Sequence, residues 1–296
     1  MSDIAITVFT PTFNRAYTLD NLYQSLKRQT CMNFEWLVID DGSTDNTKLL
    51  FDEWLKINNS FPIRYIKVEN GGKHRAINKG VPLAKGKLFF IVDSDDFLTE
   101  DAIGKIQQWE NELPKDSNAF SGVAGAKGYS VKQMIGSGSA VTYVDASSQD
   151  RKKFGITGDK AEAYYTDVLK QFPFPTFEGE NFLTESVVWF AIGEAGYKIR
   201  WYNDIIYIAE YLQDGLSNND NLIFEKNPYG LLALLKSDLK HLKLPLIRRL
   251  ACYATYYQVA KNIGLTNKEI ENDLNISKFK IYIAVLLKKI KKAIIK

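Results

Sequence analysis

The chain has 296 residues, 45% of them hydrophobic, and a formal net charge of +3 at pH 7. This length and apolar content suffice for a full hydrophobic core, which excludes a disordered chain and fits one large α/β domain with an appendage. The two cysteines, Cys31 and Cys252, lie far apart and outside any CxxC or metal-binding spacing, so neither a disulfide framework nor a zinc site is expected.

No targeting or membrane-spanning segment is predicted. The first residues lack the basic start and long apolar stretch of a signal peptide, and no apolar run reaches the length of a membrane span. We therefore expect a protein of the reducing cytoplasm.

Strand-like runs alternate with helical patterns through the first part of the chain. Residues 4–10, 34–39 and 63–68 are predicted strands, and each is followed by a polar loop and a helical pattern. Such alternation is typical of βαβ units with right-handed crossovers. We expect an α/β fold with a Rossmann-like, mostly parallel central sheet and flanking helices, whose strand-end loops meet along one edge.

A fourth strand, residues 88–92, ends in three carboxylates, those of Asp93, Asp95 and Asp96. Carboxylates this close repel one another, and a hard divalent cation such as Mg²⁺ or Mn²⁺ would relieve the repulsion. The alternative is an acidic turn that caps a helix starting near Thr99. The preceding loops favour the cation because they add Asp40, Asp41, Lys73 and Arg75 to the same edge.

Two of these loops have plain structural alternatives. Asp40 opens an Asp-Asp-Gly-Ser sequence that is also ordinary turn chemistry. Lys73 and Arg75 follow two glycines at a helix start, where cations would face phosphates, although they could also form a solvated basic patch. His74 alone predicts no ligand role.

Four segments in this order resemble the nucleotide-sugar-binding motifs of family 2 glycosyltransferases, which have the GT-A fold. They are Thr-Pro-Thr-Phe-Asn-Arg (residues 10–15), Val-Ile-Asp-Asp-Gly-Ser-Thr-Asp (38–45), Asn-Gly-Gly-Lys-His-Arg-Ala-Ile-Asn (70–78) and Val-Asp-Ser-Asp-Asp (92–96). The resemblance implies an inverting, metal-dependent enzyme. Its donor would be a nucleotide-sugar, most commonly a UDP-sugar, with Mn²⁺ or Mg²⁺ bridging the diphosphate.

Transferred residue by residue, the resemblance also implies roles for single side chains. Asp40 or Asp41 would accept the uracil N–H, Asp93 would face the ribose or a metal-bound water, and Asp95 would ligate the metal, with Asp93 as the second metal candidate. The residues expected to bind the nucleotide-sugar are Pro11, Thr12, Asn14, Arg15, Asp40, Asp41, Lys73, Arg75, Asp93, Ser94 and Asp95.

The second half of the chain has a weaker pattern. Residues 122–126, 141–144 and 205–211 are predicted strands, and residues 158–172 form a helix or a strand that must stop at Pro173. Gly158 and Asp159 resemble a family segment that passes close to the donor sugar. Asp214, in an Asp-Gly turn, is a candidate for a loop that closes over the diphosphate.

A general base is expected at the start of a later helix. Many family members have an acidic pair there, and the second acid takes the proton of the acceptor hydroxyl. An ungapped count back from Gly196 places this acid at Glu185, and Thr184 replaces its usual acidic neighbour. Glu180 and Glu178 remain alternatives, and Glu185 could instead cap the helix. One base without a carboxylate nucleophile suits single displacement with inversion.

The last part of the chain is predicted to be helical, with two or three short helices before a tail. Residues 276–296 combine apolar bulk with seven lysines and no acid. This composition fits a basic amphipathic helix on an anionic membrane surface at the inner face of the plasma membrane, or a helix that packs on the domain. Nucleic acid is not an expected partner, because arginines and aromatic residues are sparse among the lysines.

We therefore expect a GT-A domain over residues 1–217, divided into a nucleotide-sugar-binding half (1–112) and an acceptor-binding half (113–217), and a helical C-terminal region (218–296). The expected acceptor is a glycan or lipid-linked glycan of surface polysaccharide synthesis. One alternative is a nucleotidyltransferase, which would normally open with a Gly-rich basic loop that residues 11–15 lack. The other is an inactive nucleotide-sugar- or glycan-binding module, which would need neither Asp95 nor Glu185.

Overall fold

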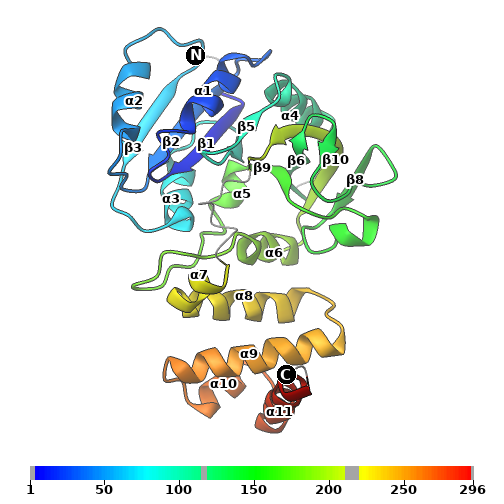
Figure 1. The fold of residues 1–296 in the computed structure, drawn as a ribbon. Helices are drawn as coiled ribbons and strands as arrows, with labels where there is room; N and C mark the ends of the chain where they lie inside the picture. The colour runs from blue at the N-terminus through cyan, green and yellow to red at the C-terminus, as the bar shows by residue number, and fades with distance from the viewer. Residues whose placement is uncertain (1–3, 115–118, 211–219, 295–296) are drawn as a thin grey trace.

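A computed structural model describes residues 4–114, 119–210 and 220–294 of the chain. Figure 1 shows a curled sheet with helices on both faces and, on one side of it, a stack of C-terminal helices. Asp214 lies outside the described residues.

The first four long strands form the parallel part of the sheet, as the sequence predicts. Their order is β3-β2-β1-β4, and all three pairings are parallel. The strands and their connecting helices are β1 (Ile6–Thr12), α1 (Leu19–Lys27), β2 (Phe34–Asp40), α2 (Thr47–Trp54), β3 (Ile63–Lys67), α3 (Lys73–Gly80), the 3₁₀ turn η1 (Val81–Leu83) and β4 (Leu88–Ile91). Because parallel strands share a direction, the loops after them meet at one edge.

The second half extends this sheet with antiparallel pairs and one parallel pair, β6 with β10, so that the ten-stranded sheet is mixed. The order continues β4-β9-β6-β10-β5, and β9 runs antiparallel to both of its neighbours. The elements are β5 (Phe97–Leu98), α4 (Ala102–Asn111), β6 (Phe120–Ser130), β7 (Gln133–Met134), β8 (Tyr143–Ala146), η2 (Arg151–Phe154), β9 (Lys160–Tyr165), α5 (Thr166–Leu169), α6 (Ser186–Glu194) and β10 (Lys198–Ile208).

Two hydrophobic clusters cover the two faces of the sheet. On one face Tyr23 of α1 and Trp54 of α2 stack at 4.3 Å and pack over Trp36 of β2. On the other face α3 and α6 pack over β1, β4 and β9, where Trp189 of α6 stacks on Tyr164 at 4.3 Å. The sheet is therefore buried on both faces, which explains the continuous apolar runs of β1 and β2.

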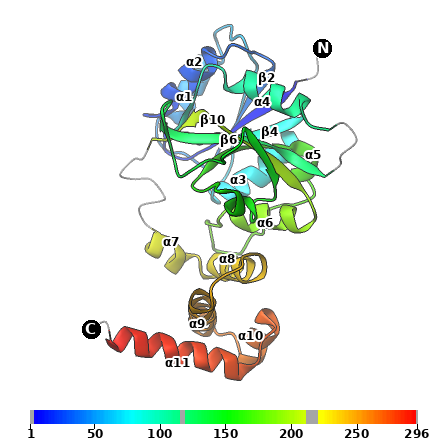
Figure 2. The same cartoon turned by 90° about the vertical axis from the view of Figure 1, so that its right-hand side faces the viewer.

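Five helices follow, more than the sequence predicts: α7 (Asp220–Lys226), α8 (Pro228–His241), α9 (Leu246–Asn262), α10 (Asn267–Leu274) and α11 (Lys278–Ile294). One helix boundary that the sequence analysis did not predict, between α9 and α10, has a local cause: Thr266 and Glu269 form a capping box that starts α10. The stack leads away from the sheet, from α8 beside α6 to α11 lying across α9 (Figures 1 and 2). No described helix is long and apolar enough to cross a membrane.

Candidate functional site

Thr12 and Asp40 end neighbouring strands and are paired in register. The first strand continues through Pro11 and Thr12, which the sequence analysis assigned to a loop, and both residues are buried. The Thr12 hydroxyl is buried without a hydrogen-bond partner in the described structure. A buried hydroxyl without a partner is unusual and is explained if a ligand or water binds it.

Asp40 is fully buried and already bonded to protein groups. Its carboxylate accepts the backbone N–H of Ser43 at 2.7 Å and the hydroxyl of Tyr65. Asp41 accepts the N–H groups of Gly71 and Gly72, each at 2.8 Å, so it joins the loop after β2 to the loop after β3. Burial raises the pKa of Asp41, although these two N–H groups oppose the rise.

Asn14 holds the loop after β1 against the loop after β2. Its backbone has a positive φ of 52°, and its side-chain oxygen accepts the N–H of Thr44 at 2.7 Å. Its own N–H donates to the Ser43 hydroxyl at 2.8 Å. Asparagine tolerates this left-handed conformation better than most residues. Asn14 thus shapes the expected nucleotide pocket through the backbone.

Lys73 links two acids that the sequence analysis assigned to different tasks. Its Nζ lies 2.5 Å from Asp93 Oδ1 and 2.8 Å from Glu185 Oε1. Although burial alone would lower it, these acids hold the pKa of Lys73 above its ordinary value. For Asp93 burial acts in the raising direction, but the charges of Lys73 and Lys127 keep its pKa below the ordinary value.

The backbone before Lys73 can be formed only by glycine. Gly72 has φ +92°, and a Cβ there would lie 1.7 Å from the carbonyl oxygen of Asn181. This close approach places the start of α3 against the segment that leads to Glu185. Gly72 is therefore needed to bring Lys73 and Glu185 together.

The other two acids of the turn after β4 differ in surroundings. Asp95 lies 3.8 Å from Arg15 Nε, and burial together with Asp93 raises its pKa. Asp96 accepts the Tyr207 hydroxyl at 2.6 Å and the N–H of Glu210 at 2.9 Å. Burial and the charge of Asp93 raise its pKa to about 6. The capping alternative for this turn is wrong, because α4 starts only at Ala102 and has Asp101 at its N-cap.

Ser94 contributes its backbone to this turn. It is buried, and its carbonyl accepts the Thr18 hydroxyl at 2.9 Å, which fixes the turn against the start of α1. Tyr207 was missed by the sequence analysis, although it lies in a predicted strand. Its hydroxyl donates to Asp96 and accepts the N–H of Asp93 at 3.0 Å. A tyrosine within an apolar run gives no indication in the sequence that its hydroxyl binds Asp93 and Asp96.

The described residues contain no group of three His, Cys, Asp or Glu side chains placed to hold a metal ion. A site built from Asp95 and Asp93 fits Mg²⁺ or Mn²⁺ in another way, because such ions are often held by one or two carboxylates plus phosphate and water oxygens. Partial burial and the charge of Asp93 disfavour the ionised form of Asp95, and a cation would favour it.

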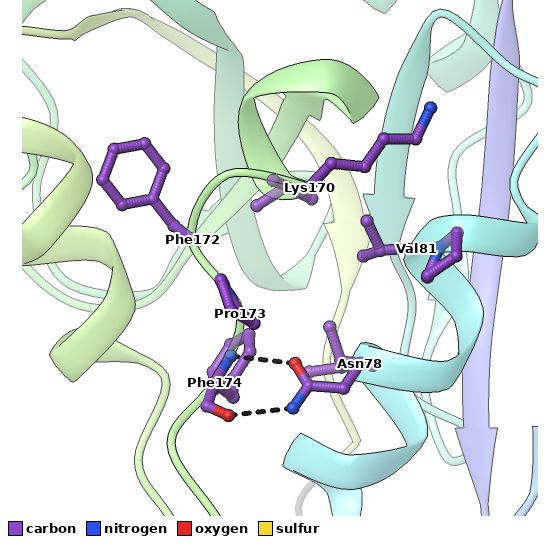
Figure 3. A pocket seen from close by; sticks show the side chains of 9 residues that line it. Asn78, Val81, Lys170, Phe172, Pro173 and Phe174 are labelled. Atoms are coloured by element: carbon purple, nitrogen blue, oxygen red, sulfur yellow. Dashed lines mark hydrogen bonds between the residues drawn. The ribbon is translucent and has the colours of Figure 1, made fainter.

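Arg75 lies among backbone carbonyls. Its Nη2 donates to the oxygens of Phe177 at 2.5 Å and Glu180 at 3.3 Å. One turn along α3, the side chain of Asn78 exchanges two 2.8 Å hydrogen bonds with the backbone of Phe174 beside a shallow apolar hollow (Figure 3). Both residues fix the segment before Glu185 against α3. A donor phosphate would have to compete with these backbone carbonyls for the guanidinium of Arg75.

The three candidate bases lie in different settings. Glu180 is 7% exposed and accepts the N–H groups of Tyr229 and Gly230 at 2.7 and 2.8 Å, so it caps α8. Glu178 is exposed. Glu185 occupies the N-cap position of α6, as the capping alternative expects, but its side chain makes no capping hydrogen bond. Of the three, Glu185 lies at the strand-end edge beside Lys73.

Comparison with solved structures defines the class of protein. The chain has the GT-A glycosyltransferase fold. It resembles the crystal structure of Staphylococcus aureus TarS 1–349 with a TM-score of 0.58 and 18% identity, over 95% of this chain and 79% of that one. It resembles the mannosyltransferase PcManGT from Pyrobaculum calidifontis, in complex with GDP-Man and Mn²⁺, with a TM-score of 0.58 and 16% identity, over 96% and 86%.

Residues 7–157 match the family model described as glycosyl transferase family 2. The matched segment covers half of the chain, and the chain belongs to this family. Glycosyltransferase GlyG of Streptococcus pneumoniae is 36% identical over 117 residues, which are 39% of this chain and 38% of GlyG. TuaG of Bacillus subtilis, named for teichuronic acid biosynthesis, is 28% identical over 145 residues, 48% of this chain and 56% of TuaG. The match thus spans about half or less of these relatives.

Proposed function

We propose that the chain is an inverting, metal-dependent glycosyltransferase that moves a sugar from a UDP-sugar to a hydroxyl of a glycan or lipid-linked glycan acceptor. The observation that carries the proposal is the ion-paired row Asp93, Lys73 and Glu185, at 2.5 and 2.8 Å, at the carboxyl edge of the parallel strands. It puts a candidate base next to the acid expected at the donor.

The comparisons support a nucleotide-sugar donor of this kind. TarS 1–349 has been solved in complex with UDP-GlcNAc, and PcManGT in complex with GDP-Man and Mn²⁺. The buried, unpartnered hydroxyl of Thr12 and the fixed loops at Asn14 and Asp41 give the nucleotide a preformed surface. We assign residues 1–112 to donor binding and residues 113–217 to the acceptor side, with surface polysaccharide as the product class.

In the proposed reaction Glu185 accepts the proton of the acceptor hydroxyl while the oxygen of that hydroxyl bonds to the anomeric carbon of the donor sugar. The bond from that carbon to the diphosphate breaks on the opposite face, which inverts the configuration. A positioned carboxylate base typically contributes about 10²–10⁴ in rate. Asp95 and Asp93 would hold Mn²⁺ or Mg²⁺, which when bound supplies positive charge to the leaving diphosphate. Lys73 must release Glu185 before this carboxylate can take the proton.

The alternatives separate in one assay. Family membership argues against a nucleotidyltransferase, and an inactive binding module would bind UDP without turnover. The experiment is UDP release from a panel of UDP-sugars with acceptor glycans, with and without Mn²⁺. We expect metal-dependent release with one donor class. Binding of UDP without release by any donor would leave only the binding module.

We also propose that α11 binds an anionic membrane surface. Its inner face packs on the neighbouring helices through Ile281 and Ala284, so the packing alternative holds for that face. The outer face exposes Phe279 (73%) and Leu286 (57%), and lysines accompany them without an acid. Figure 2 shows this helix at the end of the molecule farthest from the sheet. Exposed apolar side chains flanked by lysines are typical of interfacial helices.

A further inference from the structure

A hollow of about 130 Å³ opens beside the start of α6, immediately after Glu185. Its lining comes from the loop and turn before β9, from β9, from α6 and from the residue after α8: Ser148, Gln149, Arg151, Lys152, Glu162, Ser186, Trp189, Phe190 and Leu242.

Two side-chain atoms of this lining are buried and lack partners. Gln149 Oε1 and Arg151 Nη1 have no hydrogen bond in the described structure, while Arg151 Nη2 donates to the carbonyl of Gly158 at 2.9 Å. Leaving such groups unpaired is costly, because they give up bonds to water. A hydroxyl-rich ligand would supply a donor for Gln149 and an acceptor for Arg151.

Glu162 adds an acidic group to the same wall. Within the described residues it makes neither a hydrogen bond nor an ion pair, and burial raises its pKa to about 7, opposed by the charges of Arg151 and Lys127. A carboxyl group of this kind can donate to or accept from a sugar hydroxyl.

Trp189, Phe190 and Leu242 contribute apolar side chains to the lining. Trp189 is held flat against Tyr164 at 4.3 Å and edge-on to Phe174 at 5.7 Å, so its orientation is fixed. Pockets that bind small ligands commonly combine such aromatic walls with a few placed polar groups. An aromatic wall facing hydrogen-bonding groups matches a sugar ring, which has apolar C–H faces and a hydroxyl rim.

The hollow adjoins the proposed base and belongs to the second half of the chain. Ser186 of its lining follows Glu185 directly, and the charge of Glu185 acts on Glu162. On β9, Glu162 precedes Ala163, which pairs with Phe90 of β4, the strand that leads to Asp93. The donor residues expected from the first three loops contribute nothing to this lining.

We propose that this hollow binds one sugar ring of the acceptor beside Glu185, with Gln149, Arg151 and Glu162 binding its hydroxyl groups and Trp189 its apolar face. The proposal rests on the proposed function and specifies the acceptor as a saccharide recognised through an unsubstituted ring. Under this proposal Arg151 and Glu162 contribute to acceptor binding and do not contribute to UDP binding.

The test is saturation-transfer NMR on the full chain with UDP and Mg²⁺, using the methyl glycosides of glucose, galactose, N-acetylglucosamine and N-acetylgalactosamine as probes. Arg151→Met and Glu162→Met remove the polar groups while keeping side chains of similar length. Lys153→Met is the matched control, because Lys153 is exposed on the same turn and pairs with Asp150 at 2.6 Å. We expect at least one glycoside to bind the parent and Lys153→Met equally, and about tenfold more weakly to each of the two pocket variants.

The inference fails if no glycoside binds the parent chain, or if both pocket variants bind the glycosides as the parent does. UDP affinity, measured in the same samples, reports whether each variant is folded. The UDP measurement also separates the two proposals. If the parent chain does not bind UDP, the proposed function is contradicted. If all chains bind UDP and the two pocket variants bind the glycosides as tightly as the parent, only the acceptor subsite is contradicted.

Discussion

Lys73 Nζ lies 2.8 Å from Glu185 Oε1, and the same ammonium lies 2.5 Å from Asp93 Oδ1. One cation thus joins the proposed base to the acid at the donor edge. The start of α3 and the start of α6 are held together by this contact, although the two residues are more than a hundred positions apart in the chain. A donor diphosphate or a metal ion that draws Lys73 or Asp93 away would free the proposed base, so the proposed function predicts that donor binding and base activation are coupled.

Removing the charge of Lys73 should test how much its two ion pairs stabilise the fold. In Lys73→Met both carboxylates lose their partner, and we expect the free energy of unfolding to fall by about 1–2 kcal/mol, less than for a fully buried pair because each side chain is about 30% exposed. Thermal unfolding measures the effect, and Lys48→Met, which breaks an exposed pair with Asp52, is the control. Equal stability of the two variants would contradict a stabilising role for the Lys73 ion pairs.

Glu185→Gln should keep UDP binding and lose transfer. The amide preserves the shape but takes no proton, so we expect a fall of about 10²–10⁴ in the transfer rate. UDP affinity by calorimetry and UDP release with acceptor measure the two effects separately. Transfer at the parent rate would exclude Glu185 as the base, and loss of transfer in Glu178→Gln instead would move the assignment to that exposed residue.

The pKa of Glu162 predicts a pH-dependent stability difference. Burial raises this pKa from an ordinary value of 4.5 to about 7, so between these values the folded chain binds more protons at this site than the unfolded chain. Stability contributed by the site therefore falls as the pH rises from 4.5 to 7. Glu162→Gln removes the titration. We expect the variant to gain stability relative to the parent over this range, measured by chemical denaturation, and a pH-independent difference would contradict the assignment.

The outer face of α11 should decide membrane binding. We expect the full chain to sediment with vesicles containing phosphatidylserine and not with neutral phosphatidylcholine vesicles. Replacing Phe279 and Leu286 by serine should abolish sedimentation, whereas Leu49→Ser, at a similarly exposed position on α2, should leave it unchanged. Undiminished pelleting of a chain truncated after Asn275 would contradict the proposal.

The parallel half of the sheet follows from local sequence, because each strand is an apolar run closed by a polar loop. The same local signals place Asp93 and Lys73 at one edge. They could not show that Asp41 ties two loops together or that Glu180 caps α8, because these bonds join segments that are 30 or more residues apart.

The second half is less visible in the sequence for a related reason. Its strands mix antiparallel pairs with the parallel pair of β6 and β10, and they pair out of chain order, with β9 inserted between β4 and β6, so pairing depends on tertiary contacts. The hollow at Arg151 and Glu162 is a product of that insertion, since its walls come from β9 and from α6 packed over it. Neither residue stands in a recognisable motif.

The most direct test is a crystal structure of the chain soaked with UDP and Mn²⁺. The account predicts manganese on Asp95, the diphosphate beside it, and the uridine over the ends of β1 and β2 near Thr12 and Asp41. Manganese absent from Asp95, or UDP bound away from the loops after the first four strands, would contradict it.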